Sequence, residues 1–387
     1  MIEKIYLDNA ATTQVSRQVA DGVFRCLTEE FGNPSSLHHL GLQSERLMKD
    51  ARNIVAGFIR AEDKEIIFTS GGTESNNLGI LGAASARKRF GNHCITTQIE
   101  HSSVLNTFAY LQGEGWDVTY LSVDKNGSID IEELKNAIKD NTVLVSIGHV
   151  NSEIGSIQPL GEIGLYLKRN YPDIIFHTDS VQSFGRLDLK PGEWGIDLLS
   201  ASGHKIHAPK GIGILYVKNG ISINPRQWGG GQEWGIRSGT ENLPGIVGLG
   251  KAVSWIKEIK AKEEDTLSEI KAALVKGIFK AVPEAVINGP EPGMGAPHIV
   301  SLSIPGIKGE TLMHVLETHG VYVSTGSACS SRKSDKSHVL SAIGADKLVA
   351  EGTIRISLSY LNTLEELSCI PSILRAAIDQ VKKYTRR

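Results

Sequence analysis

The sequence predicts an α/β protein: a mainly parallel β-sheet flanked by helices, followed by a smaller α+β domain. Two patterns carry this prediction. From about residue 65, short runs of β-branched and apolar residues alternate with amphipathic stretches of helical spacing. After Gly239 the order changes to a long helical stretch, a Pro/Gly-rich link, and a mixture of strands and helices.

Seven candidate strands follow one another in the first part. They are expected at 65–70, 94–100, 117–123, 142–150, 174–180, 196–202 and 211–217. Amphipathic stretches such as 131–139 and 160–169 separate them and are expected to be helices. Because a helix between two strands returns the chain to the same end of the sheet, most of these strands should be parallel.

The second part begins with one long expected helix over 246–282. The Pro/Gly-rich stretch 287–297, INGPEPGMGAP, is the best candidate for an internal domain boundary. Further strands and helices are expected at 298–304, 310–319, 320–324, 353–359 and 364–384.

Composition limits the classes of function. The chain has 387 residues, 40% hydrophobic and 22% charged, with a formal net charge of −2, which is ordinary for a globular protein with a sizeable core. This charge balance argues against a nucleic-acid or acidic-membrane surface. The N-terminus has no targeting pattern, no apolar run approaches ~20 residues, and the cysteines form no C-x-x-C pair. We therefore expect a cytoplasmic protein with reduced thiols and no membrane or nucleic-acid partner.

Polar side chains follow the ends of successive predicted strands. In chain order they are His101, Asn151, Asp179, Gln182, His204 and Lys205. One such residue is commonly a cap or turn former, but a series of them is harder to explain by structure alone. Since the carboxyl ends of parallel strands meet at one edge of a sheet, we expect these side chains to share a pocket.

The turn SGGTES, which begins at Ser70, opens an expected helix. Backbone N–H groups in a glycine-rich turn at a helix N-terminus favour an anion, most often phosphate. An ordinary turn before a helix would have the same sequence, so this signal is weak by itself. It is neither a Walker loop nor a G-x-G-x-x-G fingerprint, which argues against a nucleotide.

Lys205 lies between two apolar runs, although lysine is rarely buried without a partner. A phosphate-binding turn, a carboxylate, an imidazole and a half-buried lysine are the parts that pyridoxal 5'-phosphate requires. Its aldehyde bonds to a lysine amine, and a carboxylate such as Asp179 keeps its ring nitrogen protonated. Lys210 is the rival lysine, but its Pro-Gly context indicates an exposed turn.

Two other kinds of site use the same residue types. A metal site would need His101, His177, Asp179 and His204, but no H-x-x-x-H or H-E-x-x-H spacing supports it, and Lys205 would add a cation to the cluster. A Ser/His/Asp hydrolase lacks a G-x-S-x-G turn after a strand.

Seven segments together resemble the cysteine desulfurases, NifS/IscS-like pyridoxal-phosphate enzymes of fold type I that are related to class V aminotransferases. They are YLDNAATT, SGGTESNN, QIEH, HTDSVQ, SASGHKIHAPKG, GGGQEWGIRSGTEN and VSTGSACSS. The resemblance runs from Tyr6 to Asn362 and implies a large cofactor-binding domain over 15–257. It also implies a small domain, made of 1–14 and 258–387, that carries the catalytic cysteine loop at about 324–337.

The resemblance implies a role for each matching residue. Lys205 would form the Schiff base, Asp179 would pair with the ring nitrogen, and His101 would stack on the ring and move protons. Gln182 would hydrogen-bond the ring hydroxyl. The expected phosphate ligands are Gly72, Thr73, Ser202 and His204 of the same subunit, together with Thr240 of the partner subunit. Asn151 and Arg355 would hold the substrate carboxylate.

Cys329 lies in a stretch of small, polar residues followed by Arg332, Lys333 and Lys336. Nearby cations favour the thiolate, and the resemblance implies that Cys329 is the catalytic cysteine. The family commonly has a proline where this chain has Lys336. The other cysteines lie in apolar contexts and are expected in the core: Cys26, Cys94 and Cys369.

The resemblance implies a homodimeric cysteine desulfurase. It would take sulfur from L-cysteine, release L-alanine and leave a persulfide on Cys329 for an acceptor such as an iron–sulfur scaffold protein. A selenocysteine lyase or aminotransferase of the same fold would need Lys205 and Asp179 but not Cys329. A non-catalytic assembly protein with this fold would bind no cofactor.

Overall fold

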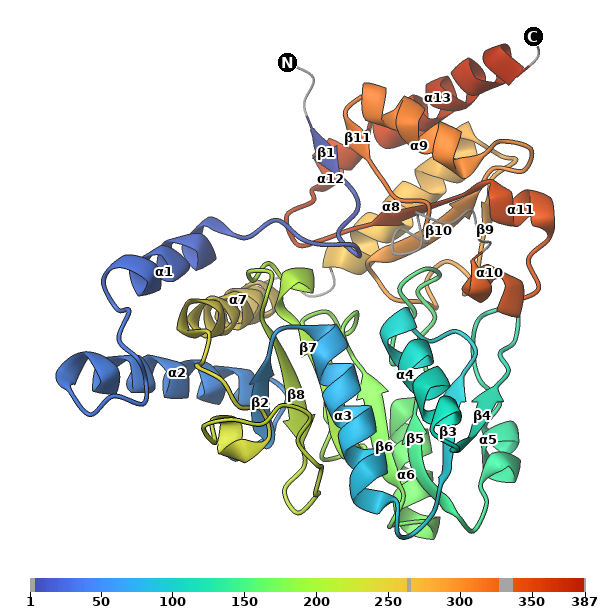
Figure 1. Ribbon diagram of the computed structural model, residues 1–387. Coiled ribbons are helices and arrows are strands. Elements are labelled where there is room, and N and C mark those ends of the chain that lie inside the picture. The colour runs from blue at the N-terminus through green and yellow to red at the C-terminus, as the bar shows by residue number, and fades with distance from the viewer. Residues whose placement is uncertain (1–3, 263–265, 327–336, 386–387) are drawn as a thin grey trace.

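The structure is a computed structural model that describes residues 4–262, 266–326 and 337–385 (Figure 1). The lower part in Figure 1 contains a large β-sheet with helices on both faces, and the C-terminal elements form an upper part. Cys329 and its basic neighbours lie outside the described residues.

The large sheet has seven strands in the order β2-β8-β7-β6-β5-β3-β4. In chain order the strands are β2 Ile66–Thr69, β3 His93–Thr97, β4 Asp117–Leu121, β5 Thr142–Ser146, β6 Ile175–Asp179, β7 Leu198–Ser202 and β8 Gly213–Val217. All neighbouring pairs are parallel except those of β8, which is antiparallel to β2 and β7. The predicted strands and the mainly parallel α/β fold are therefore confirmed.

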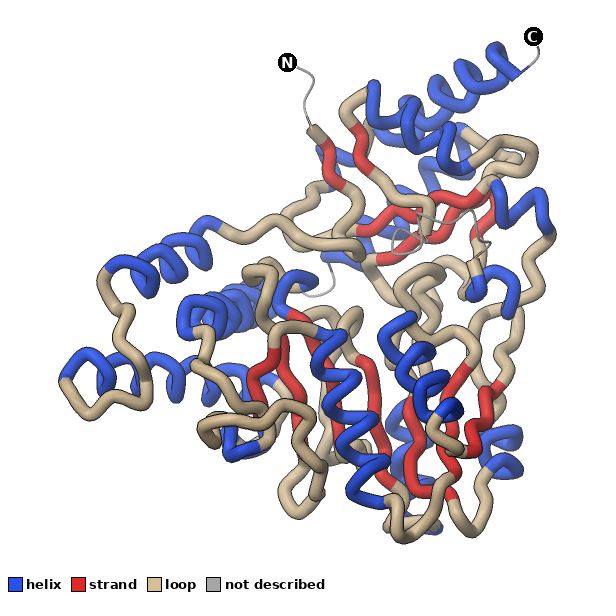
Figure 2. The backbone as a smooth tube through the Cα atoms, viewed as in Figure 1, coloured by secondary structure: helices blue, strands red, loops and turns tan. Residues whose placement is uncertain are grey.

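Each strand contributes to two cores because successive side chains point to opposite faces of a sheet. In β6, Ile175 packs into the core that contains α3 Gly72–Arg87 and α4 Ser102–Gly113. Phe176 packs into the other core, with α6 Leu160–Asn170 and α7 Leu243–Lys262. Burial on both faces explains why these strands are almost continuously apolar. Figure 2 shows the sheet between its helices.

Three more α-helices belong to the described part of the lower half of the molecule. They are α1 Arg17–Thr28, α2 His39–Phe58 and α5 Ile131–Ala137. Of these, the sequence patterns predict only α5. In Figure 1, α1 and α2 extend to the left of the sheet. Helices α2 and α7 pack against each other through Ala51 and Gly250, and a Cβ on Gly250 would come 2.9 Å from Cβ of Ala51.

The upper part is built on a small antiparallel sheet with β10 Ile299–Ser303 in the middle, between β12 Thr353–Ser357 and β9 Val286–Ile287. A second sheet pairs β1 Ile5–Tyr6 with β11 Val321–Tyr322 in parallel. The helices are α8 Thr266–Ala281, α9 Gly309–Thr318, α10 His338–Ala342, α11 Lys347–Glu351, α12 Leu364–Leu367 and α13 Ile370–Thr385.

One hydrophobic core holds the upper part together and joins the two ends of the chain. It contains Ile5 and Leu7 from the N-terminal segment and residues from Leu267 on α8 to Val381 on α13. Because α8 already packs into this core, the predicted boundary at 287–297 is wrong: that stretch lies within the upper part. The division into 15–257 and 1–14 with 258–387 stays a prediction.

The expected single helix over 246–282 is also wrong in part. The structure has two helices, with α7 ending at Lys262 and α8 beginning at Thr266. Their different partners explain the division, since α7 packs on the large sheet and α8 on the small one.

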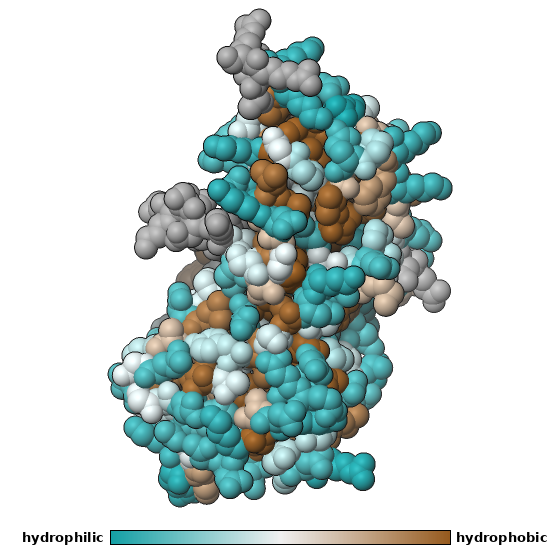
Figure 3. Space-filling view, turned by 90° about the vertical axis from the view of Figure 1, so that its right-hand side faces the viewer, coloured by the Kyte–Doolittle hydropathy of each residue, from teal (hydrophilic) through white to brown (hydrophobic). Residues whose placement is uncertain are grey.

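The face in Figure 3 is mostly hydrophilic, with apolar residues in separate small areas. None of the helices in the described ranges combines the length and the apolar character that crossing a membrane requires.

Candidate functional site

The predicted site residues gather where the strands of the large sheet end. Lys205 and Gln182 come from loops after neighbouring strands, and both donate hydrogen bonds to the carbonyl oxygen of Ala10, at 2.6 and 3.0 Å. Asp179 and His101 are connected through two further side chains, which are described below. The convergence expected from parallel strand ends is therefore observed for these four residues.

Lys205 ends a short 3-10 turn, Gly203–Lys205, that directly follows β7. Its Nζ donates to the carbonyl oxygens of Ala10 and Ala11 at 2.6 and 2.8 Å. The backbone of Lys205 is itself fixed, because the buried Arg186 donates to its carbonyl oxygen at 3.0 Å. The two carbonyl oxygens thus fix the position of the amine nitrogen at this edge of the sheet. Lys210 is exposed, as expected.

Asp179 ends β6 and accepts two hydrogen bonds. Its Oδ1 accepts from the backbone N–H of Val181 at 2.9 Å, and its Oδ2 accepts from Nδ2 of Asn76 at 2.7 Å. Asn76 is fully buried on α3 and also donates to Oγ of Ser103, at 2.9 Å. Two N–H donors therefore fix the orientation of the Asp179 carboxylate.

His101 is the N-cap of α4. Its Nδ1 accepts from the backbone N–H of Ser103 at 3.1 Å and lies 2.8 Å from the Ser103 hydroxyl. Sequence reasoning missed Asn76 and Ser103. Both stand beside predicted site residues, Asn76 within SGGTESNN and Ser103 after QIEH, but neither segment indicates that the two side chains meet.

The glycine-rich turn before α3 lies against the loop after β6 and the end of β7. A Cβ on Gly72 would come 2.6 Å from Cγ2 of Val181, and a Cβ on Gly71 would come 3.7 Å from Oγ of Ser202. Gly71 is extended with φ +154°, at the margin of the glycine-favouring region. The first N–H groups of α3 have no intrahelical acceptors, as at any helix N-terminus, and can bind an anion here. Thr73 is exposed at this end of the helix.

His204 is held neutral in the short turn after β7. Burial lowers its pKa to about 4, and the charges of Lys205 and Lys210 act in the same direction. Its Nδ1 lies 3.2 Å from Oγ1 of Thr12, so the imidazole bridges the N-terminal segment and the loop after β7. A neutral imidazole can donate one N–H to an anion.

His177 has a structural role. It is fully buried between two hydroxyls, with Nδ1 2.8 Å from Oγ of Ser146 and Nε2 3.1 Å from Oγ of Ser200. Burial lowers its pKa to about 3. Within the residues that the structure describes, no three His, Cys, Asp or Glu side chains are grouped to hold a metal ion.

Arg355, on β12, lies across the site in the upper part and is 3% exposed. It donates from one terminal nitrogen to Asp8 at 2.9 Å and from the other to the carbonyl oxygen of Ser152 at 2.9 Å. Its Nε is buried and has no hydrogen-bond partner among the described residues. A guanidinium N–H of this kind is suited to donate a hydrogen bond to a carboxylate ligand. Asp8 stands in YLDNAATT, but its pairing with Arg355 was not predicted.

Asn151 organises the loop next to Arg355. Its Oδ1 accepts from the backbone N–H groups of Glu153 and Ile154 at 2.8 and 3.0 Å, and its Nδ2 donates to the carbonyl oxygen of Ile99 at 2.8 Å. The side chain thus links the ends of two strands, and one Nδ2 hydrogen remains for a ligand.

The cysteines differ from expectation at one position. Cys26 and Cys94 are buried, as predicted, and burial raises their pKa values to about 11 and about 12. Cys369 is exposed, because it lies in the turn between α12 and α13, where its Sγ donates to the carbonyl oxygen of Glu366, 3.3 Å away.

Three comparisons place the chain among known proteins. The family model described as "Aminotransferase class-V" matches residues 5–370. A protein of Clostridium botulinum named "Cysteine desulfurase IscS" is 44% identical over 386 residues, which cover 100% of this chain and 97% of that protein. One of Methanosarcina thermophila with the same name is 43% identical over 98% of this chain and 93% of that protein.

Solved structures agree with these matches. A structure titled "NIFS-LIKE PROTEIN" superposes with a TM-score of 0.91 at 36% identity and covers 98% of this chain and 100% of its own. Another, titled "SspA in complex with cysteine", has a TM-score of 0.79 at 37% identity over 92% of this chain and 99% of its own.

Proposed function

Because the chain belongs to the class V aminotransferase family and resembles its cysteine desulfurases over its full length, we propose that it removes sulfur from L-cysteine and releases L-alanine. The sulfur is left as a persulfide on Cys329. One observation carries this function at the level of the site. The amine of Lys205 is held by Ala10 and Ala11 at the same sheet edge as Asp179, whose carboxylate has two N–H donors.

The residues at this edge fit pyridoxal 5'-phosphate. The bare turn at Gly72, the N-terminus of α3 with Thr73, and the side chains of Ser202 and His204 would hold the phosphate. Asp179 would hold the ring nitrogen, Gln182 the ring hydroxyl, and Lys205 the carbon of the aldehyde. When bound, the cofactor would withdraw electrons from the substrate carbon that bears the amino group.

The protein supplies binding and proton transfer. Arg355 and Asn151 bind the substrate carboxylate, and the unpartnered Nε of Arg355 is the natural donor. His101 and Lys205 carry the proton removed from the substrate carbon. The Cys329 thiolate takes the substrate sulfur: an S–S bond forms, the C–S bond breaks, and its electron pair returns to carbon, which a proton then completes as alanine.

We further propose that the protein acts in the cytoplasm as a homodimer, in which Thr240 of one subunit contacts the phosphate of the other. A sulfur-acceptor protein, such as an iron–sulfur scaffold, would then receive the persulfide. The relatives named cysteine desulfurase IscS support the proposal of a sulfur-acceptor protein.

The test is to incubate the cofactor-loaded protein with L-cysteine and to measure alanine and protein-bound persulfide together. Cys329→Ser should bind cofactor and substrate but should lose sulfur transfer, because a serine hydroxyl is not ionised at neutral pH while a thiol is already partly thiolate. Full turnover in this variant would indicate a selenocysteine lyase type of reaction. A need for a keto acid would indicate an aminotransferase. A persulfide on Cys26, Cys94 or Cys369 would contradict the assignment of Cys329.

A further inference from the structure

His101 is connected to Asp179 by a chain of hydrogen bonds whose direction can be determined atom by atom. The backbone N–H of Ser103 points at Nδ1 of His101, 3.1 Å away. Since an N–H donor requires an acceptor, Nδ1 carries no hydrogen. The ring proton of the neutral imidazole therefore lies on Nε2.

The next two bonds follow from the first. The Ser103 hydroxyl is 2.8 Å from the same Nδ1, so it must donate to it. Its oxygen then accepts from Nδ2 of Asn76 at 2.9 Å, and the second hydrogen of this amide goes to Oδ2 of Asp179 at 2.7 Å.

The orientation of the Asn76 amide is also determined. Turned by half a rotation, its Oδ1 would face a carboxylate oxygen, and two acceptors would repel each other. In the observed orientation Oδ1 is buried and has no hydrogen-bond partner among the described residues. An unsatisfied buried acceptor costs free energy, so the two donated bonds must outweigh that cost.

We propose that Asn76 and Ser103 are positioning residues for both reacting partners: they fix the orientation of the Asp179 carboxylate and keep His101 in the Nε2–H form. Asn76 lies on α3, directly behind the phosphate turn, and Ser103 lies in the first turn of α4. The two helices therefore orient a carboxylate and an imidazole that belong to different strand ends. This inference rests on the proposed function, because it takes Asp179 and His101 as groups that contact the cofactor.

The chain offers matched controls on the same helices. Asn77 follows Asn76, is only partly buried, and donates to the carbonyl oxygen of Thr73. Ser102 precedes Ser103 and is exposed. The experiment compares Asn76→Ala with Asn77→Ala, and Ser103→Ala with Ser102→Ala, after circular dichroism and thermal unfolding have shown that each variant is folded.

Two measurements report on the network. Nitrogen-15 NMR of the histidine rings in the cofactor-free full chain gives the tautomer of His101, whose signals are assigned from their loss in His101→Gln. The second measurement, on the cofactor-loaded protein, is the exchange of the Cα deuteron of L-alanine with water. This exchange does not involve Cys329, so it is independent of the sulfur step.

In the wild type, His101 should be the Nε2–H tautomer. Asn76→Ala should slow Cα exchange about tenfold to a hundredfold, because it removes a hydrogen bond to a charged group, and should weaken cofactor binding. Ser103→Ala keeps the backbone N–H that donates to Nδ1 but removes the hydroxyl, so it should leave His101 in the Nε2–H form, shift its Nδ1 signal and slow Cα exchange. Ser103→Thr should restore the wild-type values because it keeps the hydroxyl. The Asn77 and Ser102 variants should remain within about twofold of the wild type.

An Nδ1–H tautomer in the wild type overturns the inference, as does wild-type Cα exchange in folded Asn76→Ala. If Asn76→Ala does not fold, Ser103→Ala decides by the same two measurements. A wild type that exchanges the Cα deuteron but makes no alanine from cysteine refutes the proposed function and leaves the inference intact.

Discussion

At the scale of single residues, the environment of Lys205 predicts where the cofactor bonds. Its amine is half-buried and held by two carbonyl oxygens, whereas Lys210 is exposed in a turn nearby. The two carbonyl oxygens hold the Lys205 amine in one place, whereas nothing comparable is observed for Lys210 among the described residues. Borohydride reduction of the cofactor-loaded protein should therefore fix the label on Lys205, as peptide mapping would show. A label on Lys210 would refute the assignment.

Glu100, the residue before His101, makes stability depend on pH. Burial raises the pKa of its carboxyl to about 7, although Gly148 and Thr97 donate hydrogen bonds to it. The Asp179 carboxylate acts in the same direction and His101 opposes it. Because the folded-state pKa lies above the ordinary value of 4.5, the folded state binds more protons between these two pH values. Stability contributed by this group is thus present at low pH and lost as pH rises through about 7.

The substitution Glu100→Gln removes this dependence. At about pH 4 the free energy of unfolding of the variant should be similar to that of the wild type. At about pH 8 it should be higher than that of the wild type by about 3 kcal/mol. Urea unfolding of the cofactor-free chain at both pH values measures the difference. Glu114→Gln, at an exposed position, is the control and should show no such change. An equal difference at both pH values would mean that Glu100 is already ionised below neutral pH.

At the scale of elements, one buried ion pair holds the segment 226–241 on the lower part. Arg52 of α2 contacts Glu233 through two hydrogen bonds of 2.9 and 2.7 Å, and its guanidinium lies over the rings of Phe68 and Trp234. Glu233 and Trp234 have φ values of 46° and 56°, which non-glycine residues adopt at a cost. The ion pair and the stacked rings therefore maintain a strained turn.

Glu233→Ala should destabilise the protein by about 3–5 kcal/mol, since it leaves the charge of Arg52 buried without its partner. Asp21→Ala is the control, because it breaks an exposed ion pair with Arg17 and should cost less than about 1 kcal/mol. Denaturant unfolding measures both effects. Equal losses in the two variants would show that burial does not decide the strength of the Arg52 pair.

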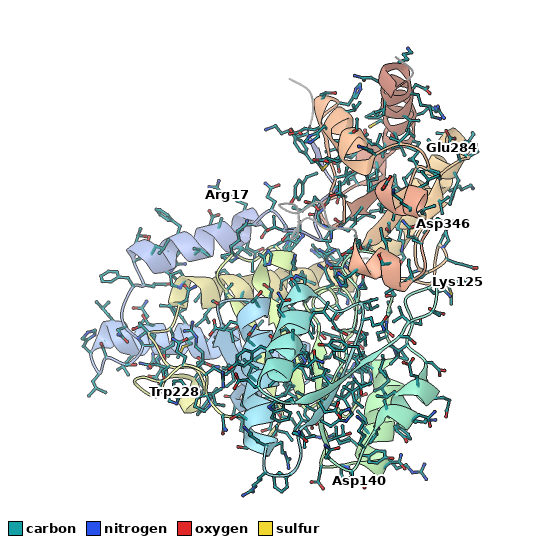
Figure 4. All side chains as sticks on the ribbon, turned by 45° about the vertical axis from the view of Figure 1, so that its right-hand side comes forward. Arg17, Lys125, Asp140, Trp228, Glu284 and Asp346 are labelled. Carbon is teal, nitrogen blue, oxygen red and sulfur yellow. The ribbon has the colours of Figure 1, made fainter. Side chains whose placement is uncertain are left out.

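At the scale of the whole molecule, exposed apolar side chains favour the proposed homodimer. Several large ones lie on α1, on the link between α1 and α2, and on the segment 226–241: Phe24, Leu27, Phe31, Leu37, Trp228 and Trp234. Figure 4 shows Trp228 on this side, opposite to Glu284 and Asp346 of the upper part. Thr240 stands in the same segment as the two tryptophans, which is where a residue shared between subunits is expected.

Trp228→Glu should therefore shift the protein from dimer to monomer, because it places a charge in an apolar contact. Sedimentation velocity measures the change. Phe90→Glu is the control: Phe90 is 55% exposed, but it lies in the turn after α3, away from the proposed interface. A dimer that tolerates Trp228→Glu, or a fully active monomer, would contradict this placement of the subunit contact.

The sequence by itself determined the central sheet and much of the site. Every strand of the large sheet except the edge strand β4 is buried on both faces, so it is a short apolar run that can be recognised locally. Polar residues at the ends of such runs, among them Asp179 and Lys205, must lie at one edge because parallel strands end there. The cofactor was predicted from the residue types at the strand ends, whereas the assignments of Cys329 and Thr240 came from the resemblance and depend on no structural contact.

Only the tertiary structure decided which side chains meet across elements. Asn76 reaches Ser103 and Asp179 because α3 and α4 pack side by side on one face of the sheet. Asp8 reaches Arg355 because the N-terminal segment joins the core of the upper part. Both contacts span long stretches of chain, and a hydrogen bond between distant residues depends on how their elements pack. A local sequence pattern carries no information on that packing.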